Sequence, residues 1–308
     1  MSHPWTTSDI PSQAGRLALV TGTGGLGYET ALELARAGAE VLLAGRNKQK
    51  GEASVRTIQE QVPRARIRFE RLDLASLSSV SDCSTKLLAE DRPIDLLVNN
   101  AGVMTPPKRL ATADGFELQF GTNYLGHFAL TAQLLPLLRR AAQPRVVNVS
   151  SLAHRSGQIH FDDLQFTRKY RPWASYGQSK LAMLMFGFEL ERRSQANGWG
   201  LISNAAHPGF ARTDLIANGP GESGALQQFG KLLKPLMSHS AAQGALPTLY
   251  AATSPQAKGG EYFGPDWFYE LKGLPKPAYV APQAKDLAVA TRLWEVSNAL
   301  TRVQWPAS

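Results

Sequence analysis

Cysteine is almost absent from this sequence: Cys83 is the only one in 308 residues, which excludes an intramolecular disulfide. The six histidines are scattered, and no group of cysteines and histidines has the spacing of metal ligands, so no metal is expected. A run of about 18 apolar residues, long enough to span a membrane, is also lacking. The polar start, MSHPWTTSDIPSQAGR, has neither the basic beginning nor the apolar core of a signal peptide. We therefore expect a soluble, cytoplasmic protein without a membrane anchor.

Charge of one sign is in excess, with a formal net charge of +8. Such a balance would suit a nucleic acid or an anionic surface, so its distribution matters. Basic residues are dense between Arg46 and Arg71, but no recognised nucleic-acid-binding motif accompanies them. We expect most of them to form a solvated helix and strand surface, and we expect no nucleic acid as a partner.

Short apolar runs alternate with amphipathic segments of helical length, which is typical of βαβ units and a parallel sheet. The pattern predicts strands over 16–21, 40–44, 66–72, 95–99, 145–150 and 201–206, and helices over 26–37, 48–61, 77–90, 114–140, 175–197 and 286–301. Pro136 predicts a kink or a restart within the fourth helix. The expected fold is a doubly wound parallel sheet, a three-layer α/β/α Rossmann fold, in a single domain spanning 1–308.

The second half of the chain interrupts this alternation. Residues 214–240 hold several glycines and two prolines around a short amphipathic piece, a profile that fits a mobile substrate lid. We expect residues 14–213 to form the cofactor-binding and catalytic core, and 241–308 to close the domain. No repeat or linker divides the chain.

A glycine-rich turn, TGTGGLG (21–27), joins the first predicted strand to the first helix. Gly22, Gly24 and Gly27 fit the pattern G-x-G-x-x-G, in which glycines let the backbone approach a pyrophosphate at a helix N-terminus. The strand before and the helix after support this interpretation. A glycine-rich connection without a ligand is the alternative.

Later motifs together resemble the short-chain dehydrogenases/reductases. They are NNAG (99–102) after the fourth strand, the serine pair 150–151 ending the fifth, YGQSK (176–180) and HPGFART (207–213). The segments NYLGHFALT (123–131) and VVNVSSLAHRSGQIHFDDL (146–164) are similar to the branch that contains retinol-dehydrogenase-like and protochlorophyllide-reductase-like proteins, and 5–16 to its bacterial members. One feature departs from the family: its turns place three residues between the first two glycines, whereas only Thr23 and Gly24 separate Gly22 from Gly25.

The candidate catalytic pair is Tyr176 and Lys180, which lie four residues apart and therefore on one helix face. A tyrosine with a pKa of about 10 is a poor acid or base near neutrality unless a cation favours its phenolate. The resemblance implies that Tyr176 transfers the proton, that Lys180 lowers the tyrosine pKa and binds the nicotinamide ribose, and that Ser151 polarises the substrate oxygen. It also implies that Asn123 holds a proton-relaying water. Ser150 competes with Ser151, which is preferred because the family uses the second serine of the pair.

The resemblance further implies that a dinucleotide is held by the glycine turn, by an adenine contact after the third strand, by the NNAG segment and by a segment that binds the nicotinamide carboxamide. These cofactor-binding candidates are Gly22, Gly24, Gly25, Leu26, Gly27, Arg46, Asp73, Leu74, Asn99, Ala101, Gly102, Tyr176, Lys180, Pro208, Gly209 and Thr213. The second strand ends LLAGRN without an acidic residue, and arginine suits a 2′-phosphate. Arg46 therefore predicts NADP(H) in preference to NAD(H). His127 and His207 are expected to be packing or hydrogen-bonding groups rather than bases.

The expected function is an NADP(H)-dependent oxidoreductase acting on lipophilic or aromatic carbonyls or secondary alcohols. Reduction of a C=C bond is a second enzymatic option, and a catalytically silent NADP(H)-binding sensor is the option of another class. The resemblance implies a homodimer or homotetramer. An apolar substrate site is expected from Met104, Leu152, Phe210, Leu215, Phe229 and Leu236, although ordinary core positions would explain half of them equally well.

Overall fold

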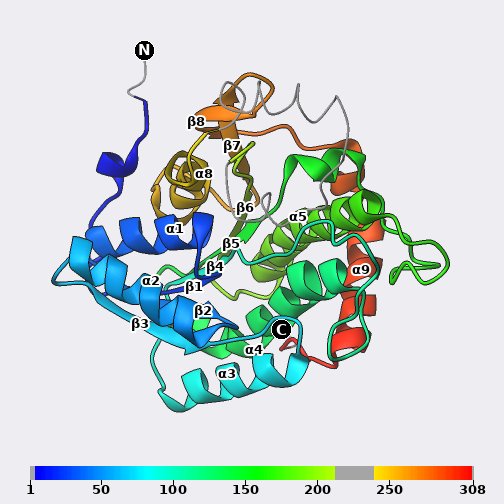
Figure 1. Ribbon diagram of the computed structural model, residues 1–308, viewed down its shortest axis with the longest axis horizontal. Helices are drawn as coiled ribbons and strands as arrows, with labels where there is room; N and C mark the ends of the chain where they lie inside the picture. Colours follow the sequence, from blue (N-terminus) through cyan, green and yellow to red (C-terminus); the bar gives the residue numbers. More distant parts are fainter. Residues whose placement is uncertain (1–3, 212–238, 307–308) are drawn as a thin grey trace.

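Eight strands form one sheet in the order β3-β2-β1-β4-β5-β6-β7-β8 (Figure 1). The computed structural model describes residues 4–211 and 239–306. Neighbouring strands from β3 to β7 are parallel, and β8 is antiparallel to β7. The strands are β1 Leu17–Thr21, β2 Glu40–Gly45, β3 Arg66–Arg71, β4 Leu96–Asn99, β5 Arg145–Val149, β6 Ile202–Ala206, β7 Tyr262–Trp267 and β8 Lys272–Pro277.

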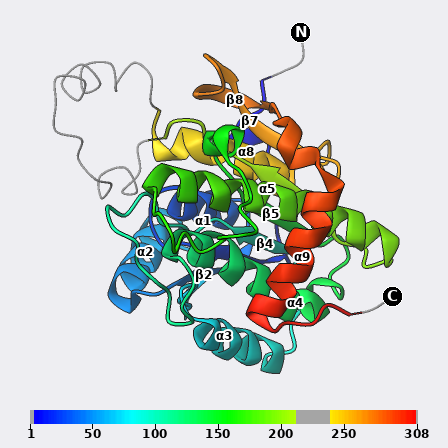
Figure 2. The same cartoon turned by 90° about the vertical axis from the view of Figure 1, so that its right-hand side faces the viewer.

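Helices cover both faces of this sheet, as the predicted three-layer fold requires. The helices are α1 Gly25–Arg36, α2 Lys48–Gln61, α3 Leu77–Ala89, α4 Gly126–Leu138, α5 Pro172–Ala196, α8 Ala241–Thr253 and α9 Leu287–Thr301. Short turns are η1 Thr7–Asp9, η2 Phe120–Leu125, η3 Leu152–Ser156 and η4 Pro282–Lys285. One core joins the sheet to α1, α2 and α8, and the other joins it to α3, α4, α5 and α9. Figure 2 shows α9 beside α4 and α5.

All six predicted strands are confirmed. Strands β1, β4 and β5 are buried at every position, as expected of a parallel sheet that is covered on both faces. Strands β7 and β8 were not predicted. Pro265 of β7 faces Pro275 of β8 in the register, and prolines in a sequence argue against a strand except at a sheet edge. Pro275 lies on the edge strand β8, and Pro265 lies beyond Tyr262 and Phe263, the two residues of β7 that pair with β6.

The predicted helix 114–140 is wrong in its first part. Ala111 and Glu117 form an antiparallel bridge, and the buried Glu117 carboxylate then accepts the N–H groups of Gln119 at 3.0 Å and Phe120 at 2.8 Å. The chain continues through the π-helical turn η2 into α4, which passes through Pro136 without a restart. A local carboxylate cap therefore decides where this helix begins.

Helix α8 was also missed, because Gly244 and Pro247 lie inside it. Its start is capped by Ser240, whose Oγ accepts from the N–H of Gln243 at 3.2 Å. A Cβ on Gly244 would come within 2.7 Å of the Ala211 Cβ, so the glycine permits close packing. No helix in the two described ranges combines the length and apolar character needed to cross a bilayer.

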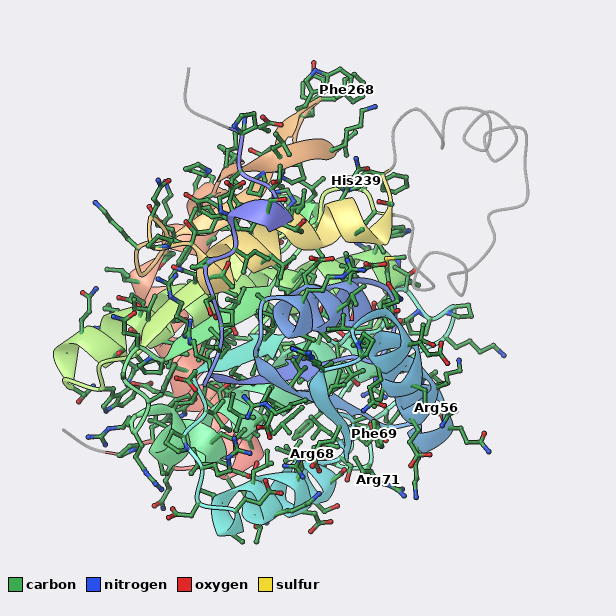
Figure 3. The ribbon with its side chains drawn as sticks, turned by 90° about the vertical axis from the view of Figure 1, so that its left-hand side faces the viewer. Arg56, Arg68, Phe69, Arg71, His239 and Phe268 are labelled. Atoms are coloured by element: carbon green, nitrogen blue, oxygen red, sulfur yellow. The ribbon has the colours of Figure 1, made fainter. Side chains whose placement is uncertain are left out.

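The predicted lid 214–240 lies outside the described residues except for its last two positions. His239 lies just before α8 (Figure 3). Its Nε2 is 2.6 Å from the carbonyl oxygen of Pro208. Of the segment predicted to be a lid, the structure thus describes His239 and Ser240 alone.

The aromatic cluster under α9 supplies one test of the packing. Trp305 lies 4.4 Å from Trp294, 5.8 Å from Trp199 and 5.4 Å from Phe128 between ring centroids. We expect Trp305→Ala to lower the free energy of unfolding by about 2 kcal/mol, since truncation of a fully buried tryptophan costs about 3–5 kcal/mol and this one is half-buried. Urea unfolding measures the change. Trp305→Phe should lose less than half as much, and equal stability of all three proteins would contradict this packing.

Candidate active site

A cavity of about 1400 Å³ opens along the carboxyl ends of the parallel strands. The strand order reverses between β1 and β4, and ligands of doubly wound sheets bind at such a switch point. Most of the predicted site residues line it: Gly22, Gly24, Gly25, Leu26, Arg46, Asp73, Leu74, Ala101, Gly102, Ser151, Tyr176, Lys180, Pro208 and Gly209. Gly27, Asn99 and Asn123 are buried behind its wall. Thr213 lies outside the described residues.

The shortened glycine turn still brings the N-terminus of α1 to the cavity. Gly22 and Gly25 adopt φ values of +95° and +49°, which favour glycine. A Cβ on Gly27 would lie 2.1 Å from the Gly22 carbonyl oxygen. Helix α2 supports the turn from outside, because Ser54 Oγ donates to the carbonyl oxygen of Thr23 at 2.8 Å. The first N–H groups of α1, which have no partner within the helix, are therefore available to an anion.

Arg46 follows β2 at the edge of this cavity. Its side chain is exposed, and it forms no ion pair with any described residue. Asn47 caps α2 by accepting from the N–H of Lys50 at 3.0 Å, and both residues line the cavity. Asn47 and Lys50 were missed, although their position in the helix start after the second strand was a usable signal. This corner gathers two cations and a helix N-terminus.

Most other basic residues of the 46–71 stretch lie away from the cavity. Arg56, Arg68 and Arg71 line a separate groove beside β3 (Figure 3). Arg68 pairs with Glu70 at 2.6 Å, and Arg56 and Arg71 are exposed. These positions correspond to the solvated surface that the sequence predicted.

Tyr176 and Lys180 lie on α5 at the opposite end of the cavity from Arg46. Tyr176 is 9% exposed and Lys180 is 6% exposed. The Lys180 ammonium lies 5.9 Å from the centre of the Tyr176 ring, and it donates to the carbonyl oxygen of Val149 at 3.0 Å. The helix spacing therefore places a buried cation beside a buried phenol, as predicted.

The serine pair divides into two different environments. Ser150 Oγ donates its hydrogen to the carbonyl oxygen of Lys180 at 2.7 Å. Ser151 Oγ accepts from the N–H of Ala153 at 3.2 Å, so its own hydrogen can be donated to an oxygen in the cavity, such as the phenol oxygen of Tyr176. This difference favours Ser151 as the group that polarises a substrate oxygen.

Burial changes the pKa values of both Tyr176 and Lys180. Desolvation raises the pKa of Tyr176, and the hydrogen bond with Ser151 opposes that rise. Desolvation lowers the pKa of Lys180 to about 8. Lys180 consequently keeps its charge in most molecules at pH 7, where a cation can stabilise a phenolate.

This buried charge predicts a pH-dependent stability. Below pH 8 Lys180 is charged in both states, and only the folded state bears the desolvation cost of roughly 3 kcal/mol, at about 1.4 kcal/mol per pKa unit. Between pH 8 and 10.5 the unfolded chain binds the proton and the folded chain does not, so this group's contribution to stability rises with pH. We expect Lys180→Met to be more stable than wild type by about 2 kcal/mol at pH 7.

Urea unfolding of both proteins from pH 7 to 10 measures this difference. Taking the difference removes other titrating groups, among them Cys83, whose pKa burial raises to about 11. The stability gap should narrow as the pH rises. A constant gap, or a less stable Lys180→Met protein at pH 7, would contradict a charged and desolvated Lys180.

Asn123 is fully buried in η2 and bonds to two parts of the site. Its Oδ1 accepts from the N–H of Val103 at 2.7 Å. Its Nδ2 donates to the Val103 carbonyl at 2.9 Å and to Ser179 Oγ at 3.0 Å. Both amide hydrogens therefore tie the loop after β4 to α5. The water that Asn123 is predicted to hold stays a prediction.

The NNAG segment has a divided role. Asn99 Nδ2 donates to Thr131 Oγ1 at 3.0 Å and to Asn148 Oδ1 at 2.9 Å, so Asn99 braces β4 against α4 and β5. Asn100, which was not predicted, lines the cavity and donates from Nδ2 to the Thr21 carbonyl at 2.7 Å. Its amide packs against Gly22. The second asparagine of the motif thus supports the glycine turn.

Apolar side chains line the same cavity as Tyr176 and Lys180. Met104, Leu152 and Phe210 line it, whereas Leu215, Phe229 and Leu236 lie outside the described residues. Trp173 was missed: it lines the cavity, is 61% exposed, and its ring lies 6.1 Å from that of Tyr176. Helix α5 begins at Pro172, before the predicted start at residue 175, so the three-residue helical spacing of Trp173 from Tyr176 could not be used.

The turn after β6 is held by the β7–β8 hairpin. Gly209 has φ +65°, and a Cβ there would lie 2.3 Å from the Leu271 carbonyl oxygen. His207 Nδ1 accepts from the N–H of Gly209 at 3.2 Å, and Nε2 faces the Glu270 carboxylate at 3.2 Å. Burial lowers the pKa of His207, which fits its predicted hydrogen-bonding role. No metal-ligand cluster of His, Cys, Asp and Glu occurs in the described part of the chain.

Comparison with known proteins gives consistent relatives. A family model described as short chain dehydrogenase matches residues 16–221. Human retinol dehydrogenase 13 is 42% identical over 311 residues, which cover 98% of this chain and 90% of that protein. Human polyprenol dehydrogenase is 38% identical over 299 residues, covering 96% of this chain and 87% of that one. The crystal structure of an uncharacterised Mycobacterium paratuberculosis protein matches with a TM-score of 0.82 at 40% identity, covering 99% of this chain and all of that one.

Proposed function

Because this chain belongs to the short-chain dehydrogenase/reductase family, in its retinol-dehydrogenase-like branch, we propose that it is an NADP(H)-dependent oxidoreductase. It interconverts a lipophilic or aromatic carbonyl compound with the corresponding alcohol. One observation carries this proposal: Tyr176, Lys180 and Arg46 line the same cavity. Three strand spacings separate β2 from β5 in the sheet, roughly 14 Å at about 4.8 Å each, which suits a dinucleotide.

The residues present fit this cofactor. A Cβ on Gly27 would clash with the Gly22 carbonyl oxygen, so glycine lets α1 begin close against the turn, and the N-terminus of α1 offers N–H groups to a pyrophosphate. Arg46 and Lys50 offer cations to a 2′-phosphate. When bound, NADPH supplies the hydride for reduction.

The chain's own residues manage the proton. As a carbonyl carbon is reduced, negative charge develops on its oxygen, and Ser151 stabilises that charge by donating a hydrogen bond. Tyr176 gives its phenolic proton to the same oxygen, acting as general acid. The Lys180 ammonium, 5.9 Å from the ring centre, stabilises the phenolate that remains. In alcohol oxidation the phenolate takes the proton back.

The lipophilic substrate class rests on two further supports. Met104, Leu152 and Trp173 line the cavity beside Tyr176, and an exposed indole favours an apolar ligand. The names of the relatives specify retinol and polyprenol, and both are lipophilic alcohols.

A product assay tests this function. The protein is mixed with NADPH and a panel of long-chain aldehydes, aromatic ketones and an enone, and the products are identified. We expect an allylic alcohol from the enone. A saturated ketone would show C=C reduction instead, and tight NADPH binding without turnover of any panel member would favour the silent sensor.

A further inference from the structure

His127 is a fully buried histidine between two parts of the candidate site. Its Nδ1 lies 2.9 Å from the carbonyl oxygen of Asn123, and its Nε2 lies 2.9 Å from Thr21 Oγ1. Thr21 ends β1 directly before the glycine turn, and Asn123 lies in η2. The imidazole therefore bridges the strand that carries the glycine turn and the turn that leads into α4.

The two contacts define one tautomer of the ring. A carbonyl oxygen only accepts, so Nδ1 carries the hydrogen and donates to Asn123. The Nε2 lone pair is then left to accept the Thr21 hydroxyl hydrogen. Burial lowers the pKa of His127 to about 4, and the charge of Lys180 acts in the same direction. The ring is consequently neutral at physiological pH, with Nδ1 as a hydrogen-bond donor and Nε2 as an acceptor.

Thr21, the partner of His127 Nε2, also bonds to the cavity wall. Its Oγ1 accepts from the N–H groups of Asn100 and Ala101, each at 2.9 Å. Asn100 and Ala101 line the cavity, and a hydroxyl that accepts two N–H groups must direct its own hydrogen elsewhere. The competing acceptor, the Val98 carbonyl, is farther away at 3.3 Å. His127 therefore orients the hydroxyl that holds the start of the loop after β4.

Asn123, the partner of His127 Nδ1, also bonds to helix α5, which carries Tyr176 and Lys180. Its side chain bonds to Val103 and to Ser179, the residue before Lys180. A Cβ on Gly102 would lie 3.0 Å from Asn123 Oδ1 and 3.6 Å from Lys180 Nζ. A shift of the Asn123 backbone would thus move the loop at Val103 and the surroundings of Lys180 together.

We infer that His127 is a positioning residue for the reaction: its Nε2 fixes residues 100 and 101 through Thr21, and its Nδ1 fixes residue 103 and the Lys180 surroundings through Asn123. This inference rests on the proposed function for its kinetic readouts. It assigns separate consequences to the two ring nitrogens, which a residue that merely fills space would not have.

Two isosteric variants separate the nitrogens. The amide of His127→Asn can still donate near the Nδ1 position but does not reach Thr21, and the amide of His127→Gln can accept from Thr21 but loses the short bond to Asn123. Loss of one buried hydrogen bond corresponds to about a tenfold change. We expect His127→Asn to raise the NADPH dissociation constant about tenfold with kcat within about twofold, and His127→Gln to show the reverse.

Amide hydrogen exchange without cofactor supplies a readout that needs no activity. His127→Asn should speed exchange at the amides of Asn100 and Ala101, and His127→Gln should speed it at Val103. Thr21→Val should speed exchange at the same amides as His127→Asn, and the double variant Thr21→Val/His127→Asn should exchange no faster than either single variant. Thr21→Ser keeps the hydroxyl and should show the wild-type exchange rates.

Equal effects of both variants on all three amides, or changes in thermal stability alone, would overturn the inference. The exchange data judge His127 even if wild type reduces no carbonyl in the panel. A wild-type protein that reduces no carbonyl would contradict the proposed function. The positioning role of His127 would then be judged by amide exchange alone.

Discussion

Tyr176→Phe is expected to lower kcat for carbonyl reduction by about 10³-fold, within the range of about 10²–10⁴ that a positioned general acid contributes. The substitution removes only the phenolic oxygen, so the ring should keep its place beside Trp173. NADPH affinity should stay within about twofold, because loss of a transition-state interaction lowers kcat without weakening ground-state binding. Steady-state kinetics and fluorescence titration of NADPH measure the two quantities.

Tyr124→Phe is the matched control for this variant. Tyr124 is also buried, at 1% exposed against 9% for Tyr176, and bonds to Ser297 Oγ at 2.7 Å, but it does not line the cavity. Its loss should lower stability by about 1 kcal/mol, as for one buried hydrogen bond, and leave kcat unchanged. If Tyr176→Phe kept more than half of the wild-type rate, Tyr176 would not be the proton donor.

Arg46→Asp is expected to raise the KM for NADPH about 100-fold and to leave that for NADH nearly unchanged, since charge-assisted bonds contribute about 1.5–3 kcal/mol each. The arginine has no described ion-pair partner and lies at the cavity edge with Lys50. An aspartate there would repel a 2′-phosphate and could accept from the ribose hydroxyls of NADH. Initial rates with each cofactor at several concentrations measure the change.

Arg56→Asp makes the same change of charge on α2, the helix that follows Arg46. Arg56 lines the groove beside β3 (Figure 3) and not the cofactor cavity. It should therefore leave the NADPH-to-NADH ratio nearly as in wild type. If Arg46→Asp left that ratio unchanged, or if Arg56→Asp changed it equally, Arg46 would not determine cofactor choice.

The sequence predicted those parts of the fold whose signals are local. Strands such as Leu17–Thr21 are continuous apolar runs between turn residues, so their length and burial follow from the pattern. Strand β7 and helix α8 escaped because Pro265 and Pro247 interrupt their patterns. Both prolines are buried within these elements, and burial depends on the rest of the fold, which no local window of sequence contains.

The candidate site divides in the same way. Tyr176 and Lys180 share a helix face, so four-residue spacing alone brings them together. His127 meets Thr21 across 106 residues of sequence, and only the paired strands and α4 bring these side chains into contact. Trp173 was missed for a different reason, since an exposed aromatic on a helix resembles any surface residue until the cavity beside it is known.

The shortened glycine turn shows where the sequence left the outcome open. Its motif lacked one residue relative to the family, and nothing in the local sequence indicated how the gap was closed. In the structure Thr23 packs against Gly45, where an added Cβ would lie 2.7 Å from the Thr23 methyl group. The Ser54 hydroxyl donates to the Thr23 carbonyl oxygen. Contacts from β2 and α2 therefore support the shorter turn.

The most direct test of NADPH-dependent carbonyl reduction is the stoichiometry of one reaction. Purified protein is incubated with NADPH and a long-chain aldehyde, and the alcohol formed is compared with the NADP⁺ formed over the same interval. The proposed function predicts one alcohol per NADP⁺, with both products absent in the Tyr176→Phe reaction on that timescale. NADP⁺ without alcohol, or equal alcohol formation by the two proteins, would contradict it.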